Sequence, residues 1–440
     1  MIILRKVDLT QGNVFFVLLS LTIPIVGSSF LQFTYSLVDM LWLGSLGSDS
    51  VASVGSSSFF INLGYAINTL VVVGTGIKVS HSLGKNDDEQ VKSYINVGIF
   101  INFILATLYS LALIFFGDNL IEFLGIGDKN VEREAYLYLI INAPVIFFAF
   151  FDFLYIRILN SYGHNSQALK ISVIGVVINI ILDPIFILKF GALGAGIATL
   201  IANMVMFFMF LVKFKELFKY HFEIPLNKEK ILEIISLGIP MTTQRVLFNI
   251  VNISLAKIIS NFGAEAIAGQ KIGLQIESIT FMIIGGLNGA VASFIGQNYG
   301  AKEYKRIIKG YNIALKMGIC YALITSSLFL IFSDNIVSIF IKDTATIQIA
   351  SMYIKIVAFA QIFSAIEMVS NGMFTGLGMP KIPATISIIF TVLRIPMALV
   401  LIKYFGVNGV WLSISMSSVL KGIFSYIMYI LKVRKDKNYA

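Results

Sequence analysis

Cysteine and histidine are scarce in this sequence, which limits the chemistry open to the chain. The 440 residues include one cysteine, Cys320, and three histidines. A single cysteine excludes an intramolecular disulfide and a cysteine-rich metal site. His81, His164 and His221 fall at or beyond the ends of apolar segments and form no cluster. The sequence therefore does not support a metal enzyme, and we expect neither enzymatic activity nor a cofactor.

Charge is also scarce. Only 13% of the residues are charged and 57% are hydrophobic, whereas a typical soluble domain has roughly 25% charged residues. A soluble fold cannot bury this much apolar surface, so the solvent must be lipid. Twelve apolar segments can cross a hydrocarbon core of about 30 Å as tilted helices. They are approximately Val14–Leu43, Val51–Leu83, Ser93–Phe116, Tyr136–Leu159, Leu169–Leu188, Gly194–Val212, Ile231–Ser260, Ile267–Ile295, Ile307–Phe332, Tyr353–Phe374, Ile382–Ile402 and Val407–Leu431. We predict an all-α polytopic membrane protein.

The basic residues lie in particular loops. The net charge of +9 does not indicate nucleic-acid binding, because the lysines and arginines alternate between loops rather than following one face. They are dense at the N-terminus, between Lys213 and Lys230, between Lys302 and Lys309, and after Leu431. Cytoplasmic loops carry such an excess, so we expect a cell inner-membrane protein with both termini in the cytoplasm. The first segment lacks the cleavage site of a secretory signal, so we expect it to be retained.

The two halves of the chain align with each other almost without gaps. Ser20-Leu21-Thr22-Ile23-Pro24 matches Ser236-Leu237-Gly238-Ile239-Pro240, and Gly191 matches Gly406 at an offset that is shorter by a single position. This offset contains an even number of helices, so the repeats have the same orientation in the membrane. We predict an N-terminal six-helix lobe at 1–212, a cytoplasmic linker at 213–230 and a C-terminal six-helix lobe at 231–440. Rocking of the two lobes would give alternating access.

Glycine-rich sequences do not indicate nucleotide binding. Gly74-Thr75-Gly76 and Gly285-Gly286 lie within apolar segments, and no Gly-Lys-Ser/Thr sequence occurs. Close helix packing explains these glycines better. Transport by this chain would then be driven by an ion gradient.

Asp39 and Asp183 lie inside predicted helices of the first half. Ionisable residues within spans are costly and mark functional sites by default. Asp183 follows Asn179 by four residues, so both side chains share one helix face. Asp39 and Asp183 in one poorly hydrated pocket would repel each other and take up a proton or a cation. With the hydroxyl of Thr199 they offer hard oxygen ligands of the kind that suit Na⁺.

Prolines adjoin this predicted site. Pro184 cannot donate to the carbonyl one turn earlier and leaves that oxygen free, and Pro24 offers a point at which the first helix can bend. Simpler roles stay open for each residue. The acids would then be solvated at the outer interface, Asn179 would join two helices by a hydrogen bond, and Thr199 would be a small packing residue.

The second half has different intramembrane charges. Asp39, Asn179 and Asp183 align with Leu255, Arg394 and Ala398, so the acid site belongs to the first half. The intramembrane charges of the second half include Arg245, Glu277, Glu367 and Arg394. Because an unpaired charge is expensive there, we expect the pairs Arg245–Glu277 and Arg394–Glu367. They form either a structural polar core or a carboxylate site for cationic substrate.

The sequence resembles the multidrug and toxic compound extrusion (MATE) family over nearly its whole length. The resemblance rests on Pro24, Asp39, Asn179 with Asp183-Pro184, and Gly296-Gln297-Asn298-Tyr299-Gly300-Ala301 preceded by Gln275-Ile276-Glu277-Ser278. The acid pair resembles the branch related to the DNA-damage-inducible F protein.

The resemblance implies an antiporter that exports amphipathic, often cationic, small molecules in exchange for H⁺ or Na⁺. Its cation site would comprise Tyr35, Asp39, Tyr138, Asn179, Asp183 and Thr199, with Na⁺ held by Asp39, Asn179 and Asp183. Another branch carries an acid in the seventh helix, where this sequence has Phe248. That second site is therefore not expected here.

Other functions remain as alternatives. A flippase of the same superfamily, moving a lipid-linked oligosaccharide, usually has a cleft rich in Arg and Lys, whereas the first half here offers acids. A membrane enzyme would need an intramembrane His/Asp or metal cluster, which is not visible. The duplication also argues against a channel. We expect small-molecule substrates, membrane lipids and no nucleic acid as partners, and a monomer suffices for the transport cycle.

Overall fold

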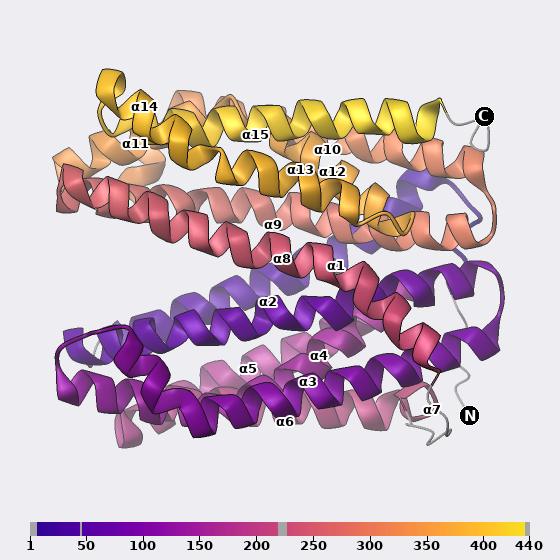
Figure 1. Cartoon of the computed structure of the whole chain (residues 1–440), viewed down its shortest axis with the longest axis horizontal. Helices are drawn as coiled ribbons and strands as arrows, with labels where there is room; N and C mark the ends of the chain where they lie inside the picture. Colours follow the sequence, from indigo (N-terminus) through magenta and orange to yellow (C-terminus); the bar gives the residue numbers. More distant parts are fainter. Residues whose placement is uncertain (1–6, 45, 219–226, 436–440) are drawn as a thin grey trace. The chain divides into compact units, whose positions relative to one another are not determined.

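The computed structural model describes residues 7–44, 46–218 and 227–435, which contain helices and no strand (Figure 1). In a membrane, helices satisfy their backbone groups within each segment. The first half contains α1 (Val14–Gly44), α2 (Ser48–Gly84), α3 (Asp88–Phe123), α4 (Lys129–Ser161), α5 (Asn165–Phe190), α6 (Ala192–Lys213) and the short α7 (Lys215–Phe218). The second half contains α8 (Lys228–Ile259), α9 (Ala264–Gly300), α10 (Tyr304–Ser338), α11 (Thr344–Ala358), α12 (Gln361–Gly376), α13 (Lys381–Val392), α14 (Arg394–Phe405) and α15 (Asn408–Tyr429).

The spans confirm the predicted fold class. In the described ranges, eleven helical segments are long and apolar enough to cross a membrane, and α11 with α12 forms a twelfth that is bent by 57°. Side chains from neighbouring helices bind carbonyl groups near this bend. The Ser326 hydroxyl donates to the Ala358 carbonyl at 2.8 Å, and the Ser415 hydroxyl donates to the Ile356 carbonyl at 3.1 Å. The broken span therefore remains satisfied within hydrocarbon.

The chain packs as two compact units whose boundaries differ from the two halves of the sequence. Unit 1 comprises Gly27–Thr242 and the described residues before Leu9, and unit 2 comprises Leu9–Val26 and the described residues from Thr243 onward. The helices α1 and α8 are therefore each divided between the units. Each division comes two residues after a proline of the repeat, Pro24 or Pro240. Of the predicted linker, residues 219–226 lie outside the described residues, as do 1–6 and 436–440 at the termini.

The start of α1 is held in unit 2 by the end of α9. The Leu9 N–H donates to Gln297 Oε1 at 3.3 Å, and Asn298 Nδ2 donates to the Leu9 carbonyl at 3.2 Å. Arg306 donates to the carbonyl groups of Leu9 and Gln11 at 3.2 and 2.5 Å. The Gly296–Ala301 motif thus supplies two side chains that fix a main-chain segment, which is a structural role.

The start of α8 is held in unit 1 in a comparable way. Glu233 forms an ion pair with Lys78 of α2 at 2.9 Å and accepts a hydrogen bond from the Tyr94 hydroxyl of α3 at 2.5 Å. Lys230 Nζ donates to Ser93 Oγ at 2.6 Å. The first turns of α8 are therefore fixed to α2 and α3.

The duplication extends to the backbone. Gly191 after α5 has φ 60° and Gly406 after α14 has φ 56°, a conformation that glycine adopts without steric cost. Asp128 and Asp343, which align at the same offset as these two glycines, cap the first turns of α4 and α11 with their carboxylates. At Asp343, hydrogen bonds from the side chain and backbone of Thr346 hold the pKa below its ordinary value. Matching turns and caps confirm the internal repeat.

A close approach of α5 and α6 generates a stability prediction. A Cβ added at Gly194 would lie 2.2 Å from the Phe186 carbonyl oxygen. Because backbone must move to relieve this overlap, Gly194→Ala is expected to destabilise the protein by about 1–3 kcal/mol. The measurement is thermal unfolding in detergent. Gly44→Ala is the matched control, since a Cβ at Gly44 meets nothing within 4 Å, and equal melting temperatures for the two variants would contradict the packing described.

Candidate functional site

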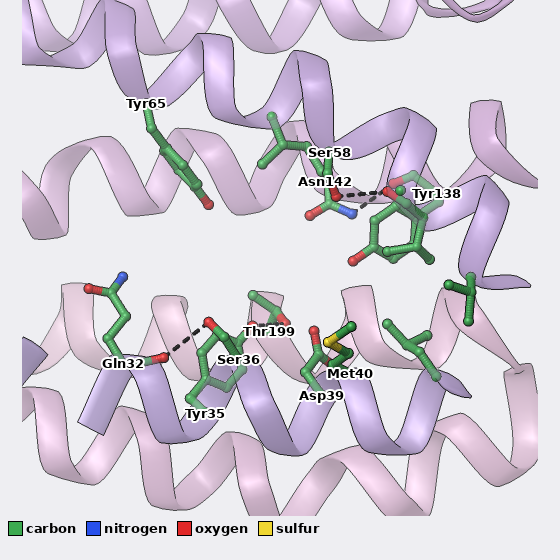
Figure 2. A pocket seen from close by; sticks show the side chains of 15 residues that line it. Gln32, Tyr35, Ser36, Asp39, Met40, Ser58, Tyr65, Tyr138, Asn142 and Thr199 are labelled. Atoms are coloured by element: carbon green, nitrogen blue, oxygen red, sulfur yellow. Dashed lines mark hydrogen bonds between the residues drawn. The ribbon is translucent and has the colours of Figure 1, made fainter. Parts of the chain in front are cut away.

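Unit 1 contains a cavity of about 390 Å³ whose walls come from α1, α2, α4 and α6. Four of the residues predicted from the sequence line it, namely Tyr35, Asp39, Tyr138 and Thr199. Figure 2 shows Tyr35 and Asp39 of α1 on one side of the cavity and Tyr138 of α4 on the other. Asp39 lies one helical turn beyond Tyr35, so α1 presents both side chains to the same space.

Asn179 and Asp183 of α5 are buried and are joined to this wall by hydrogen bonds. Asn179 Nδ2 donates to Asp183 Oδ1 at 3.3 Å and to Thr199 Oγ1 at 3.4 Å. The Thr199 and Tyr35 hydroxyl groups are 2.8 Å apart, so one donates to the other. The carboxyl groups of Asp39 and Asp183 lie close enough to interact electrostatically.

Tyr138 completes the set, because its hydroxyl interacts electrostatically with both carboxyl groups. The structure therefore brings together all six residues of the predicted cation site. Asn179 and Asp183 do not line the cavity themselves and are connected to its wall through Thr199, whereas the other four residues line it. The i and i+4 spacing of Asn179 and Asp183 does place their side chains in contact, as the sequence indicates.

Three oxygen atoms of this cluster are buried without a hydrogen-bond donor among the described residues. They are Asp39 Oδ1, Asn179 Oδ1 and Asp183 Oδ2. An unsatisfied buried polar group costs roughly 1–3 kcal/mol, so a cluster of acceptors favours a ligand that satisfies several at once. A proton would satisfy one carboxylate, and a hard cation such as Na⁺ would accept several oxygens. The donor set fits either ion.

Both prolines named from the sequence lie within continuous helices. Pro184 is inside α5 directly after Asp183, and Pro24 is inside α1. Pro184 has no N–H to donate to the carbonyl of Ile180. Pro24 belongs to unit 2, on the other side of the α1 division from Asp39.

The sequence reasoning missed several residues that line the cavity. Gln32, Ser58, Tyr65 and Asn142 are lining residues (Figure 2). Asn142 follows Tyr138 by four residues and donates from Nδ2 to its carbonyl group at 2.8 Å. That spacing is the same signal that selected Asn179 and Asp183. Tyr65 had no such signal, because it lies in an apolar stretch.

In unit 2, the expected pair Arg245–Glu277 is wrong. Glu277 accepts hydrogen bonds from the Tyr353 hydroxyl at 2.7 Å and from Gln361 Nε2 at 3.4 Å. No ion pair of Arg245 occurs among the residues that the structure describes. Glu277 is buried where α9, α11 and α12 meet, so neutral donors from the two neighbouring helices reach it.

The second expected pair, Arg394–Glu367, is corrected as well. Glu367 of α12 forms its ion pair with Lys421 of α15, with Nζ 3.8 Å from Oε1. Arg394 Nε donates instead to the Ser417 hydroxyl at 3.0 Å and interacts with Glu367 only electrostatically. Lys421 escaped the sequence reasoning, although a lysine inside a span is itself a signal.

Phe248 occupies the position at which another MATE branch would carry an acid. Its ring lies 5.9 Å from the guanidinium of Arg394, a cation–π contact. An aromatic face therefore stands where that branch would place a carboxylate.

Comparison with known proteins identifies the family. A family model described as MatE matches residues 24–185 and again residues 240–400. The chain is similar to the probable multidrug resistance protein NorM of Thermotoga maritima, at 23% identity over 94% of this chain and 91% of that protein. It is also similar to the multidrug export protein MepA of Staphylococcus aureus, at 25% identity over 96% of this chain and 95% of that protein.

A solved structure gives the same result for the fold. The outward-facing conformation of a multidrug resistance MATE family transporter of the MOP superfamily matches with a TM-score of 0.92 at 21% identity, covering 98% of this chain and 99% of that one. The two family matches begin at Pro24 and Pro240, the paired positions of the internal repeat. The chain therefore belongs to the multidrug and toxic compound extrusion (MATE) family, a family of membrane transporters.

Proposed function

We propose that this protein exports amphipathic, cationic small molecules from the cytoplasm in exchange for H⁺ or Na⁺, coupled by the acid cluster of unit 1. The observation that carries the proposal is the group of three unpaired oxygens on Asp39, Asn179 and Asp183 beside a cavity. Relatives named as a probable multidrug resistance protein and a multidrug export protein support the export of small molecules. The coupling ion is the only accessory species in this proposal, which includes no cofactor.

Coupling follows from competition for the carboxyl groups. With the acids deprotonated and free of Na⁺, the cavity is negative and attracts an organic cation. When H⁺ or Na⁺ occupies the acids, that attraction is lost and the cation is released. By linkage, each ligand must weaken the binding of the other by the same factor. A cavity wall that also contains Met40, Tyr65 and Tyr138 accepts varied apolar groups.

Alternating access requires points at which helices that join the two units can bend. We propose that α1 and α8 bend near Pro24 and Pro240, two residues before each helix passes from one unit to the other. Proline removes one backbone hydrogen bond and makes a helix easier to bend at that point. A monomer in the inner membrane with cytoplasmic termini is sufficient for this cycle.

We assign the charges of unit 2 to a polar core. Glu277, Glu367, Arg394 and Lys421 supply two negative and two positive groups, and each has a hydrogen-bonding or ionic partner. Arg245 adds a further positive charge, so these intramembrane groups have no excess negative charge to attract an organic cation. The alternative is a substrate carboxylate at Glu277 or Glu367, and variants of the Lys421–Glu367 pair test this role for Glu367.

The first prediction concerns the acids of unit 1. In liposomes under separately imposed Na⁺ and H⁺ gradients, Asp39→Asn and Asp183→Asn are each expected to slow efflux of a fluorescent cationic dye by at least about tenfold. Each substitution keeps the side-chain shape and removes the group that binds the coupling ion. The gradient that drives wild-type efflux identifies that ion.

Asp118→Asn is the matched control, because Asp118 is an exposed carboxylate of α3 that does not line the cavity. It is expected to transport at the wild-type rate. Dye efflux by wild type that persists unchanged in both cavity variants would refute the assigned coupling site. If no gradient moves the dye, the flippase alternative takes first place.

The second prediction concerns the ion pair of unit 2. Lys421→Met removes the ion-pair partner of Glu367, whose side chain is 18% exposed, and is expected to destabilise the protein by about 1–3 kcal/mol, less than the loss of one partner from a fully buried pair. Adding Glu367→Gln removes the stranded charge and should recover most of the thermal stability while dye efflux is retained. A double variant that regains stability but no longer transports the dye would show that Glu367 binds substrate.

A further inference from the structure

Asp152 of α4 is a buried carboxyl group for which the proposed mechanism has no role. Its side chain is 3% exposed, and neither of its oxygens has a hydrogen-bond partner among the described residues. Asp152 comes about four helical turns after Tyr138, so the two side chains share one face of α4. Four turns span about 22 Å, so Asp152 lies well away from the level of Tyr138, toward the end of α4 at Ser161.

The residues close to Asp152 along α4 are aromatic. Phe151 and Tyr155 both contact the ring of Phe207 of α6. Phe153 contacts the ring of Tyr65 of α2. Neither tyrosine hydroxyl donates a hydrogen bond to Asp152.

Among the described residues, none of the ionisable groups on α4 or on the helices that pack against it forms an ion pair with Asp152, although Arg157 Nε is itself buried without a hydrogen-bond partner. On α4 itself, Tyr155 interacts electrostatically with Asp152, and the guanidinium of Arg157 lies against Gly76 of α2. On α2, Lys78 pairs with Glu233. The helix α2 also has Asp49, Tyr65 and His81. The helix α3 has Asp88, Glu89, Lys92 and Tyr94 in its first turns, then Tyr109, and Asp118 and Glu122 near its end. The helix α5 has Lys170, Asp183 and Lys189, and α6 has only Lys213, at its last residue. No ion pair of Asp152 occurs in the described part of the chain.

The internal repeat explains why Asp152 has no cation. At the offset that relates the caps Asp128 and Asp343, Asp152 aligns with Glu367. At the same offset Lys421, the ion-pair partner of Glu367, aligns with Met206 of α6. Both halves therefore have an acid at this position of the repeat, but only the second half has the lysine that pairs with it.

An isolated carboxylate without a cation or donors is strongly disfavoured in such a site, whereas a carboxylic acid is tolerated. We propose that Asp152 is a second proton-binding site of unit 1, in which one carboxyl oxygen holds a proton at a distance from the cavity acids. That the proton takes part in transport rests on the proposed antiport function. That Asp152 binds it rests only on the burial of the side chain, its two unpaired oxygens and the repeat comparison.

Infrared spectroscopy of the purified protein at neutral pH tests the proposal without requiring transport. The carboxylic-acid C=O band of wild type should contain a component that Asp152→Asn removes. Met206→Lys, which keeps Asp152 and supplies the cation found in the other half, should remove the same component by converting the acid to a paired carboxylate. Glu367→Gln is the matched control and should leave the band unchanged, since Glu367 is already paired.

An acid band that is identical in wild type, Asp152→Asn and Met206→Lys would overturn the proposal, and Met206→Lys decides the matter if Asp152→Asn does not fold. Because the band is measured whether or not a dye is moved, failure of the antiport function would be seen separately in the liposome assay.

If the proton on Asp152 takes part in transport, the Asp152→Asn protein should release one proton fewer per molecule than wild type on alkalinisation. Its dye efflux should also have a different pH dependence. A merely structural neutral side chain would change neither quantity, since asparagine is also neutral. Efflux with unchanged pH dependence and an unchanged proton count would limit Asp152 to a packing role.

Discussion

A polar group inside a lipid-solvated helix bundle must find its partner within the protein. This constraint explains why the intramembrane carboxylates of unit 2 have partners within the protein and why the unpaired oxygens of unit 1 are notable. In unit 2 the carboxylate of Glu277 has donors from two neighbouring helices, and Glu367 has Lys421. In unit 1 the oxygens of Asp39, Asn179 and Asp183 are not all satisfied. Because the two units share one repeated arrangement, this difference favours ion coupling in unit 1 and a structural polar core in unit 2.

The same constraint also concerns α1 and α8, the helices that join the two units. The main chain before α1 is held in unit 2 by Gln297, Asn298 and Arg306, whereas Asp39 on the same helix lies in unit 1. The proposed bend near Pro24 would therefore lie between Asp39, the proposed coupling acid, and the anchored start of the helix. In α8 the equivalent proline, Pro240, follows a segment that is anchored through Glu233. Each joining helix has one anchored end and one weak point.

Much of the fold could be predicted from the sequence, because apolar length and repeated glycines are local signals. The spans and the duplication belong to this class. The i and i+4 relation of Asn179 and Asp183 needed only helix geometry, and the structure has their hydrogen bond.

The ion pairs of unit 2 could not be predicted, because the partner that a long side chain reaches depends on which helices pack together. Arg394 reaches Ser417 and Glu367 reaches Lys421 through the packing of α12, α14 and α15. The first part of α1 belongs to unit 2 and the first part of α8 belongs to unit 1. The internal repeat does not predict this exchange, because each half of the sequence contains a full set of six spans. The missing cation at Asp152 is evident only from comparison with Glu367, which aligns with Asp152 and pairs with Lys421.

The central claim is that the organic cation and the coupling ion compete for the acids of unit 1. The most direct test is to count the ions released when a cationic dye binds to the purified protein, using a pH indicator for H⁺ and a Na⁺-selective electrode. The account predicts that dye binding releases H⁺ or Na⁺ from wild type and that this release is lost when Asp39 and Asp183 are both replaced by asparagine. Dye binding that releases neither ion from wild type would contradict it.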